Sequence, residues 1–312
     1  MNNNKIGIVG SGGAVGVSLQ EKLKKHPVFN NFSVPASNLS KLQRSEWKQT
    51  ISAFLESNDL IILALPDEIA KKVVAVKNQI NSSTKIIDCS TAHRVSPEWS
   101  YGLPELPNQT DKIKQAELVA NPGCHATAGI LSIKPLIDEG LIIPNNFAVL
   151  TSITGHSGGG KNLIKQYEED PAIPPLQYST GIKHKHLAEI TKYSGLNNPP
   201  VFQPEVVNTF KGLKTNFFAQ TKENISDKKL IELFKEYYKN QIFINVAEIP
   251  SNGTVSMTES NDTQNVSIYP FAMGTSIQVV AVLNNLNKGA AGAAIQNANI
   301  MSDLPQTTGL TS

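Results

Sequence analysis

A strand, a glycine-rich turn and a helix follow one another at the start of the chain, and this succession constrains the fold most strongly. Residues 5–10 form a short apolar run that is typical of a buried strand. Glycines follow it, and the apolar spacing of AVGVSLQEKLKKH then favours a helix. Further apolar runs at 60–66, 85–90 and 116–121, with a helical pattern after the first, predict a doubly wound α/β domain with a parallel sheet.

The pattern changes after residue 124. Longer strand patterns beside fewer helices predict an α+β domain with a largely antiparallel sheet. These patterns lie at 147–154, 200–210, 215–221, 265–272 and 276–286. We expect a Rossmann-like domain at 1–122, an α+β domain at 123–286, and a C-terminal helical segment at 287–312 that returns to the first domain. A weaker strand pattern at 32–36 contains Pro35, which disfavours a central strand.

The composition excludes several classes of protein. Of the 312 residues, 40% are hydrophobic and 17% are charged, as in ordinary soluble globular proteins. A net charge of +2 with scattered Lys and Arg argues against nucleic acid or an anionic membrane as a partner. No apolar stretch reaches membrane-spanning length, and the first residues do not resemble a signal peptide. Two distant cysteines form no disulfide framework, so we expect a cytoplasmic protein.

The glycine-rich turn has the spacing of a dinucleotide-binding loop. Glycine lets the backbone approach a pyrophosphate, whose charge then meets amides at the helix N-terminus. The expected loop residues are Gly10, Ser11, Gly12, Gly13, Ala14, Val15 and Gly16. A tight turn that binds nothing is the alternative. The acidic residue usual about twenty positions later is absent. Ser37, Lys41 or Arg44 would suit a 2′-phosphate, which favours NADP over NAD.

Cys124 follows Pro122-Gly123 and stands at the start of a helical pattern at 126–138. Amides at a helix N-terminus favour the thiolate, which is the reactive form of cysteine. A lone cysteine is also common as a small buried hydrophobic residue, and the residues alone leave both interpretations open. Cys89, inside the apolar run 85–90, is expected to be a core residue.

The stretch GHSGGGKN, residues 155–162, matches the phosphate-binding loop of nucleotide triphosphatases at Gly155, Gly160 and Lys161. Asn162 stands where that motif needs a hydroxyl for magnesium, so a nucleotide triphosphatase is the lesser alternative. A glycine loop in which Lys161 faces a substrate anion fits better. An inert loop is the remaining alternative.

Two histidines, His184 and His186, precede Glu189. A spacing of three on a helix would place His186 and Glu189 on one face. A carboxylate can hold an imidazole in one tautomer, which suits a general acid/base. Metal binding would need a third ligand, and none is spaced nearby. A solvated basic helix face is the other alternative.

Taken together, these stretches resemble the N-acetyl-γ-glutamyl-phosphate reductase family, the N-acetylglutamate semialdehyde dehydrogenases of arginine biosynthesis. The resemblance runs from end to end of the chain, in the family's order. It rests on GIVGSGGAVG (7–16), DCSTAHR (88–94), YGLPEL (101–106), NPGC (121–124), GHSGGGKN (155–162), HKHLAEI (184–190) and KGAAGAAIQNANIM (288–301). The length and the STAHR stretch resemble the shorter of the family's two branches.

The resemblance implies an NADP-dependent oxidoreductase without a metal. In this family N-acetyl-γ-glutamyl phosphate is reduced to N-acetylglutamate 5-semialdehyde and phosphate through a cysteine thioester. Cys124 would be the nucleophile, and a protonated histidine, His184 or His186, would donate to the thiohemiacetal as it collapses. A homo-oligomer, either a dimer or a tetramer, is also implied.

The resemblance assigns the remaining positions to phosphate, substrate and cofactor. Arg94 would hold phosphate. Ser157, Gly158 and Lys161 would lie in a loop that faces substrate or nicotinamide. Asn285, with Lys288 close behind it, would precede the helix that lines the nicotinamide site.

The chain also departs from the family pattern. His125 and Ala126 replace a frequent aromatic residue and proline, and Ala188 replaces the proline of HLPE. We expect His125 to shape the pocket and not to join the chemistry. Alanine is common in the family at position 89, which favours a packing role for Cys89. The open alternatives are an aspartate-semialdehyde dehydrogenase, a reductase of a carrier-protein-linked substrate, and a non-catalytic NADP-binding sensor.

Overall fold

The computed structural model describes residues 5–35, 42–180 and 183–311. It forms two compact units, Met1–Pro122 with Ala290–Leu310, and Gly123–Gly289 with the end of the chain. Ser37 and Lys41 lie outside the described residues. Over the described ranges, no helix is both long enough and apolar enough to cross a membrane.

The first unit is built on a parallel sheet with the strand order β1-β2-β3-β5-β4. The strands are β1 Ile6–Val9, β2 Leu60–Leu63, β3 Lys85–Asp88, β4 Ser100–Tyr101 and β5 Leu118–Ala120. Strands β1 and β2 are buried on both faces, as is usual for parallel sheets covered by helices.

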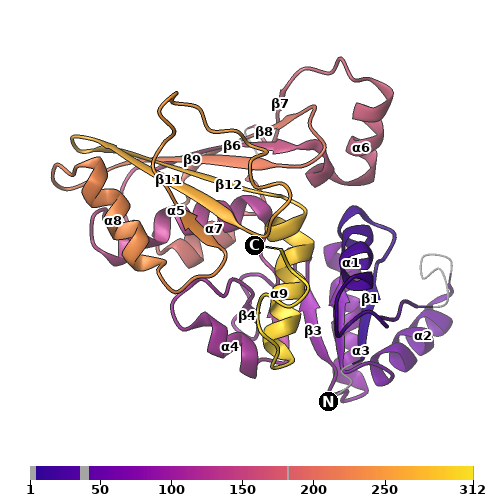
Figure 1. The fold of residues 1–312 in the computed structure, drawn as a ribbon. Coiled ribbons are helices and arrows are strands. Elements are labelled where there is room, and N and C mark those ends of the chain that lie inside the picture. The colour runs from indigo at the N-terminus through magenta and orange to yellow at the C-terminus, as the bar shows by residue number, and fades with distance from the viewer. Residues whose placement is uncertain (1–4, 36–41, 181–182, 312) are drawn as a thin grey trace. The chain divides into compact units, whose positions relative to one another are not determined.

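Helices cover both faces of this sheet, as the first unit in Figure 1 shows. Helices α1 (Ala14–Lys24) and α9 (Gly292–Met301) bury their apolar residues on one face. Helices α2 (Arg44–Glu56) and α3 (Asp67–Gln79) do so on the other. A shorter helix, α4 (Gln109–Gln115), packs against α9. The doubly wound α/β prediction is therefore confirmed.

The predicted strand at 32–36 is reduced to an isolated bridge. Ser33 pairs with Gly7, and its backbone exchanges hydrogen bonds with Ile6 and Ile8. Pro35 has no N–H with which to continue the pairing. The strand prediction was therefore too long.

The second unit contains a mixed sheet with the order β10-β11-β12-β9-β6-β8-β7. The β10–β11 and β6–β8 pairs are parallel, and the other pairs are antiparallel, so the largely antiparallel prediction is confirmed. The strands are β6 Val149–Gly155, β7 Leu176–Gln177, β8 Val201–Val207, β9 Leu213–Gln220, β10 Ile244–Val246, β11 Val266–Met273 and β12 Ser276–Leu283.

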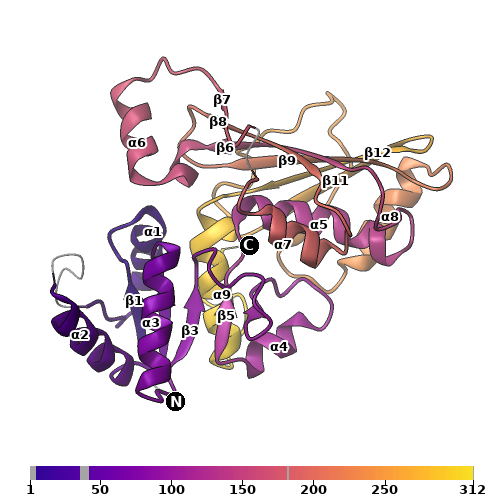
Figure 2. The same ribbon diagram turned by 180° about the vertical axis from the view of Figure 1, so that it is seen from behind.

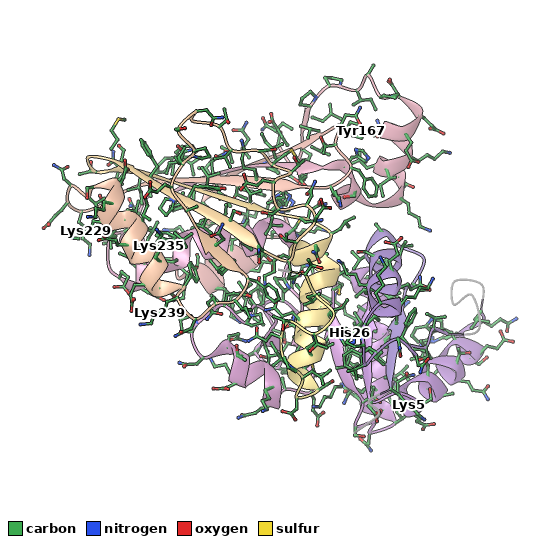
Figure 3. The ribbon with its side chains drawn as sticks, in the orientation of Figure 1. Lys5, His26, Tyr167, Lys229, Lys235 and Lys239 are labelled. Atoms are coloured by element: carbon green, nitrogen blue, oxygen red, sulfur yellow. The ribbon has the colours of Figure 1, made fainter. Side chains whose placement is uncertain are left out.

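Three helices of this unit lie on one face of its sheet, as Figure 2 shows: α5 (Cys124–Asp138), α7 (Leu187–Ser194) and α8 (Asp227–Tyr237). Helix α5 is buried nearly all round because it packs against β9, β12 and α7. It begins at Cys124 and not at residue 126 as predicted. Helix α8 is amphipathic, with Lys229 and Lys235 on its exposed side (Figure 3).

Two short helical turns lead into longer helices. A 3₁₀ turn, His156–Gly159, follows β6 and leads into α6 (Gly160–Glu169). A π-helical turn, Asn287–Ala291, leads from β12 into α9.

Candidate active site

Cys124 is the first residue of the fifteen-residue helix α5 and is partly exposed. Amides in the first turn of a helix have no intrahelical acceptor, so they favour a negative charge beside them. The Glu189 carboxylate accepts a hydrogen bond from the Gly123 N–H at 3.2 Å. Glu189 is only 1% exposed. A buried carboxylate from α7 therefore holds the backbone immediately before the thiol.

Gly289 approaches Cys124 from the other side. A Cβ built at position 289 would lie 2.6 Å from the Cys124 Cβ, which is closer than such atoms ever come. Any larger residue at this position would therefore displace the cysteine. This role of Gly289 was not predicted, because the two residues are far apart in the sequence.

The two predicted histidines lie at the start of α7. His186 Nε2 is 3.9 Å from Glu189 Oε1, so the spacing of three brings them together as the sequence predicted. The backbone N–H of His186 donates a hydrogen bond to His184 Nδ1 at 3.1 Å. A neutral His184 therefore carries its proton on Nε2. Both imidazoles are at least nine-tenths buried, which does not agree with a solvated basic face.

A third histidine, His125, completes this cluster. Its ring centroid lies 5.6 Å from that of His184 and 5.5 Å from that of His186. Burial, helped by the positive charges of His184 and Lys185, lowers the pKa of His125 to about 3. His125 is therefore neutral at physiological pH and cannot act there as a proton-donating imidazolium. Among residues 5–35, 42–180 and 183–311, no group of three or more His, Cys, Asp or Glu side chains is arranged to hold a metal ion.

Tyr178 belongs to the same cluster, although no sequence pattern pointed to it. Its hydroxyl lies 2.7 Å from His125 Nε2. Burial raises the pKa of the Tyr178 phenol, and the negative charge of the Cys124 thiolate raises it further. The phenol is therefore protonated and within electrostatic reach of the thiol.

The predicted loop residues form a second group. Asn285 Nδ2 donates to Ser157 Oγ at 2.9 Å, and Asn285 Oδ1 accepts from the Gly212 N–H at 2.8 Å. Gly158 lies beside the same amide, which a Cβ at position 158 would contact at 3.4 Å. Lys161 instead lies exposed in the first turn of α6. Of these predicted residues, Asn285, Ser157 and Gly158 therefore lie together, and Lys161 is not part of their contacts.

The glycine-rich loop of the first unit makes a tight turn between β1 and α1. Gly10 has a φ of +94°, and a side chain there would collide with the Ala64 carbonyl. Gly16 packs directly against the loop backbone. Residues 11–15 are partly or fully exposed, and no side chain caps the N-terminus of α1 at Gly13. The turn between β1 and α1 is therefore exposed, as a site for an anion at a helix N-terminus would need to be.

Arg94 and Cys89 also belong to the first unit. The buried Arg94 guanidinium donates from Nε to the Asn121 carbonyl at 2.9 Å and from Nη2 to the Cys89 carbonyl at 3.1 Å. Cys89 packs against the core. Burial, with a contribution from the Asp88 charge, raises the pKa of Cys89 to about 12. Cys89 is therefore protonated at neutral pH, in agreement with its predicted packing role.

Comparisons with known proteins identify the family. The model "Semialdehyde dehydrogenase, NAD binding domain" matches residues 5–116, and "Semialdehyde dehydrogenase, dimerisation domain" matches residues 124–285. The N-acetyl-gamma-glutamyl-phosphate reductase of Trichormus variabilis is 36% identical, over 99% of this chain and 100% of that one. The protein of the same name from Brucella ovis is 33% identical, over 95% and 98% of the two chains.

A solved structure shows the same fold. Aspartate semialdehyde dehydrogenase II from Vibrio cholerae, complexed with ASA, matches with a TM-score of 0.72 at 15% identity. The match covers 97% of this chain and 99% of that one. The chain therefore belongs to the semialdehyde dehydrogenase family and, within it, to the N-acetyl-gamma-glutamyl-phosphate reductases.

Proposed function

We propose that this protein reduces N-acetyl-γ-glutamyl phosphate with NADPH to N-acetylglutamate 5-semialdehyde and phosphate, as a step of arginine biosynthesis. The observation that carries the proposal is Cys124 at the first position of α5, next to a buried Glu189 that also approaches His186. The names of the relatives supply the substrate. The thiol would be the nucleophile of the reaction, and the imidazole beside the carboxylate would be its acid/base.

The first step forms a thioester. The Cys124 thiolate attacks the carbonyl carbon of the acyl phosphate, the carbon–oxygen bond to phosphate breaks, and phosphate leaves. Separating phosphate loss from reduction divides one difficult step into two. We assign Arg94 to the phosphate because a guanidinium fork suits phosphate oxygens. Its bonds to two backbone carbonyls support this assignment, since they fix its orientation.

When bound, NADPH would supply the hydride that reduces the thioester. The backbone of residues 10–16 would hold its pyrophosphate, which agrees with the exposure of residues 11–15 and with the absence of a side-chain cap at the start of α1. The absence of an acidic residue after the first helix favours NADP, with Ser37, Lys41 or Arg44 as partners of the 2′-phosphate. Gly158 and Asn285, which lie together, would face the nicotinamide.

A histidine controls the proton of the last step. We assign this role to His186, which protonates the thiohemiacetal oxyanion and takes the proton back as the carbon–sulfur bond breaks. The aldehyde then leaves, and the Cys124 thiolate is restored. The Glu189 carboxylate stabilises the positive charge that His186 carries as an acid. His184 accepts from the His186 backbone and orients the turn.

We also propose that the protein is a homo-oligomer and that it works in the cytoplasm. A match to a dimerisation domain over residues 124–285 supports a homo-oligomer. Both cysteines are thiols, as a reducing cytoplasm would keep them.

The test is an assay of NADP reduction with N-acetylglutamate 5-semialdehyde, with and without phosphate. We expect turnover that requires both phosphate and NADP. Faster turnover of aspartate semialdehyde, or of a carrier-protein-linked semialdehyde, would assign the protein to a different substrate. NADP binding without turnover of any semialdehyde would contradict an enzymatic function and favour a sensor.

A further inference from the structure

A chain of hydrogen bonds beside the histidine pair has no role in the reaction described above. It consists of Ser152 on β6, His125 on α5 and Tyr178 just after β7. His125 Nδ1 lies 2.7 Å from Ser152 Oγ, and His125 Nε2 lies 2.7 Å from the Tyr178 hydroxyl. Ser152 and His125 are almost fully buried. Both ring nitrogens of His125 are therefore engaged.

The direction of these bonds follows from the protons available. Ser152 Oγ donates to the Lys214 carbonyl at 3.4 Å, so it accepts from the His125 Nδ1–H. A neutral imidazole has only one N–H, so Nε2 accepts the proton of the Tyr178 hydroxyl. The lowered pKa of His125 maintains this neutral form. The Tyr178 hydroxyl therefore donates its hydrogen bond to His125 Nε2.

Tyr178 connects His125 to the reactive groups. Its ring centroid lies 5.7 Å from that of His184, and the charge of the Cys124 thiolate affects its phenol. Residues 171–180 are mostly exposed. The bond to His125 therefore attaches this exposed segment to α5, the helix that begins with Cys124.

We propose that His125 is a positioning residue that holds the Tyr178 hydroxyl, and with it residues 171–180, beside helix α5 and the His184 ring. This inference rests on the proposed function, because His186 is the acid/base of that reaction. The resemblance expects an aromatic residue at position 125. The imidazole supplies a ring there and adds two hydrogen bonds.

The test compares His125→Phe, Tyr178→Phe and the double variant. We expect each single substitution to lower kcat about tenfold, because loss of the bond between His125 and Tyr178 misplaces the acid/base. The double variant should be no slower than His125→Phe, because His125→Phe already lacks the bond to Tyr178. Hydrogen–deuterium exchange should become faster in peptides covering residues 171–187 in all three.

Tyr238→Phe is the matched control. Its hydroxyl also bonds to α5, at the Leu131 carbonyl (2.7 Å), well along the helix from Cys124. We expect Tyr238→Phe to lower stability but to leave kcat and the exchange of residues 171–187 unchanged.

The proposal would be overturned if the loss of kcat in the double variant equalled the product of the losses in the two single variants. Wild-type exchange of residues 171–187 in His125→Phe would also overturn it. If the wild-type protein does not turn over the N-acetylated substrate, the proposed function fails, whereas the exchange comparison still decides the role of His125.

Discussion

Cys89 belongs to the first unit and Cys124 to the second, and the surroundings of the two thiols differ. Each follows closely on a parallel strand, β3 or β5, and each is partly exposed. Cys89 packs against a hydrophobic core beside the Asp88 carboxylate, which together raise its pKa to about 12. Cys124 instead begins a long helix, whose first-turn amides favour the thiolate, and Glu189 accepts a hydrogen bond from the backbone just before it. The surroundings of a thiol, and not its exposure, therefore determine its expected reactivity.

Substituting the two cysteines should give the largest contrast. Cys124→Ala removes the nucleophile, and we expect kcat to fall roughly 10⁴-fold or more. Cys89→Ala should retain kcat within about threefold, since only packing changes. The measurement is steady-state NADP reduction with semialdehyde and phosphate. Comparable losses in both variants would remove the distinction between the two regions.

Substituting the two histidines should give the next largest effect. His186→Asn removes the proposed acid/base, so we expect kcat to fall by about 10²–10⁴-fold. His184→Asn should lower it only about tenfold, because that residue orients the turn. The kcat of each variant should be measured across a range of pH. If His184→Asn is the slower variant, the two roles must be exchanged.

The pH dependence of stability should give the smallest effect. His125, which faces Ser152, Tyr178, His184 and Lys185, has a folded-state pKa of about 3 against an ordinary 6.5. The unfolded chain therefore binds a proton first, and stability falls as the pH drops from 6.5 towards 3. His125→Phe should reduce this slope by about 1.4 kcal/mol per pH unit in urea unfolding.

A buried histidine of the first unit provides the comparison. His26, labelled in Figure 3, bonds to Asn299 at 3.0 Å, and burial also lowers its pKa. His26→Phe should reduce the acid slope in the same direction without changing kcat. An unchanged slope in His125→Phe would contradict a neutral, buried His125.

Local patterns predicted the framework and several parts of the site. Buried strands appear as apolar runs, and the spacing of His186 and Glu189 on one helix brought them together. Contacts between distant segments left no such pattern. The bond from Gly123 to Glu189 joins residues 66 positions apart, and that from His125 to Tyr178 joins residues 53 apart. They arise only when α5, α7 and the sheet pack together.

Short or polar elements were also missed for physical reasons. Strand β4 contains only two residues, so no alternation of apolar and polar residues can reveal it. Helix α4 has seven mostly polar residues and buries only Gln109 and Ile113. The 32–36 pattern failed in the opposite way, because Pro35 ends a pairing that the apolar residues suggest.

The most direct test of the central claim is to trap the acyl-enzyme. The wild-type protein should be mixed with N-acetyl-γ-glutamyl phosphate in the absence of NADPH, quenched in acid, digested and analysed by mass spectrometry. We predict release of about one phosphate per active site and an N-acetylglutamyl adduct on the peptide that contains Cys124, with Cys89 unmodified. Phosphate release without an adduct, or an adduct on Cys89, would contradict the thioester mechanism.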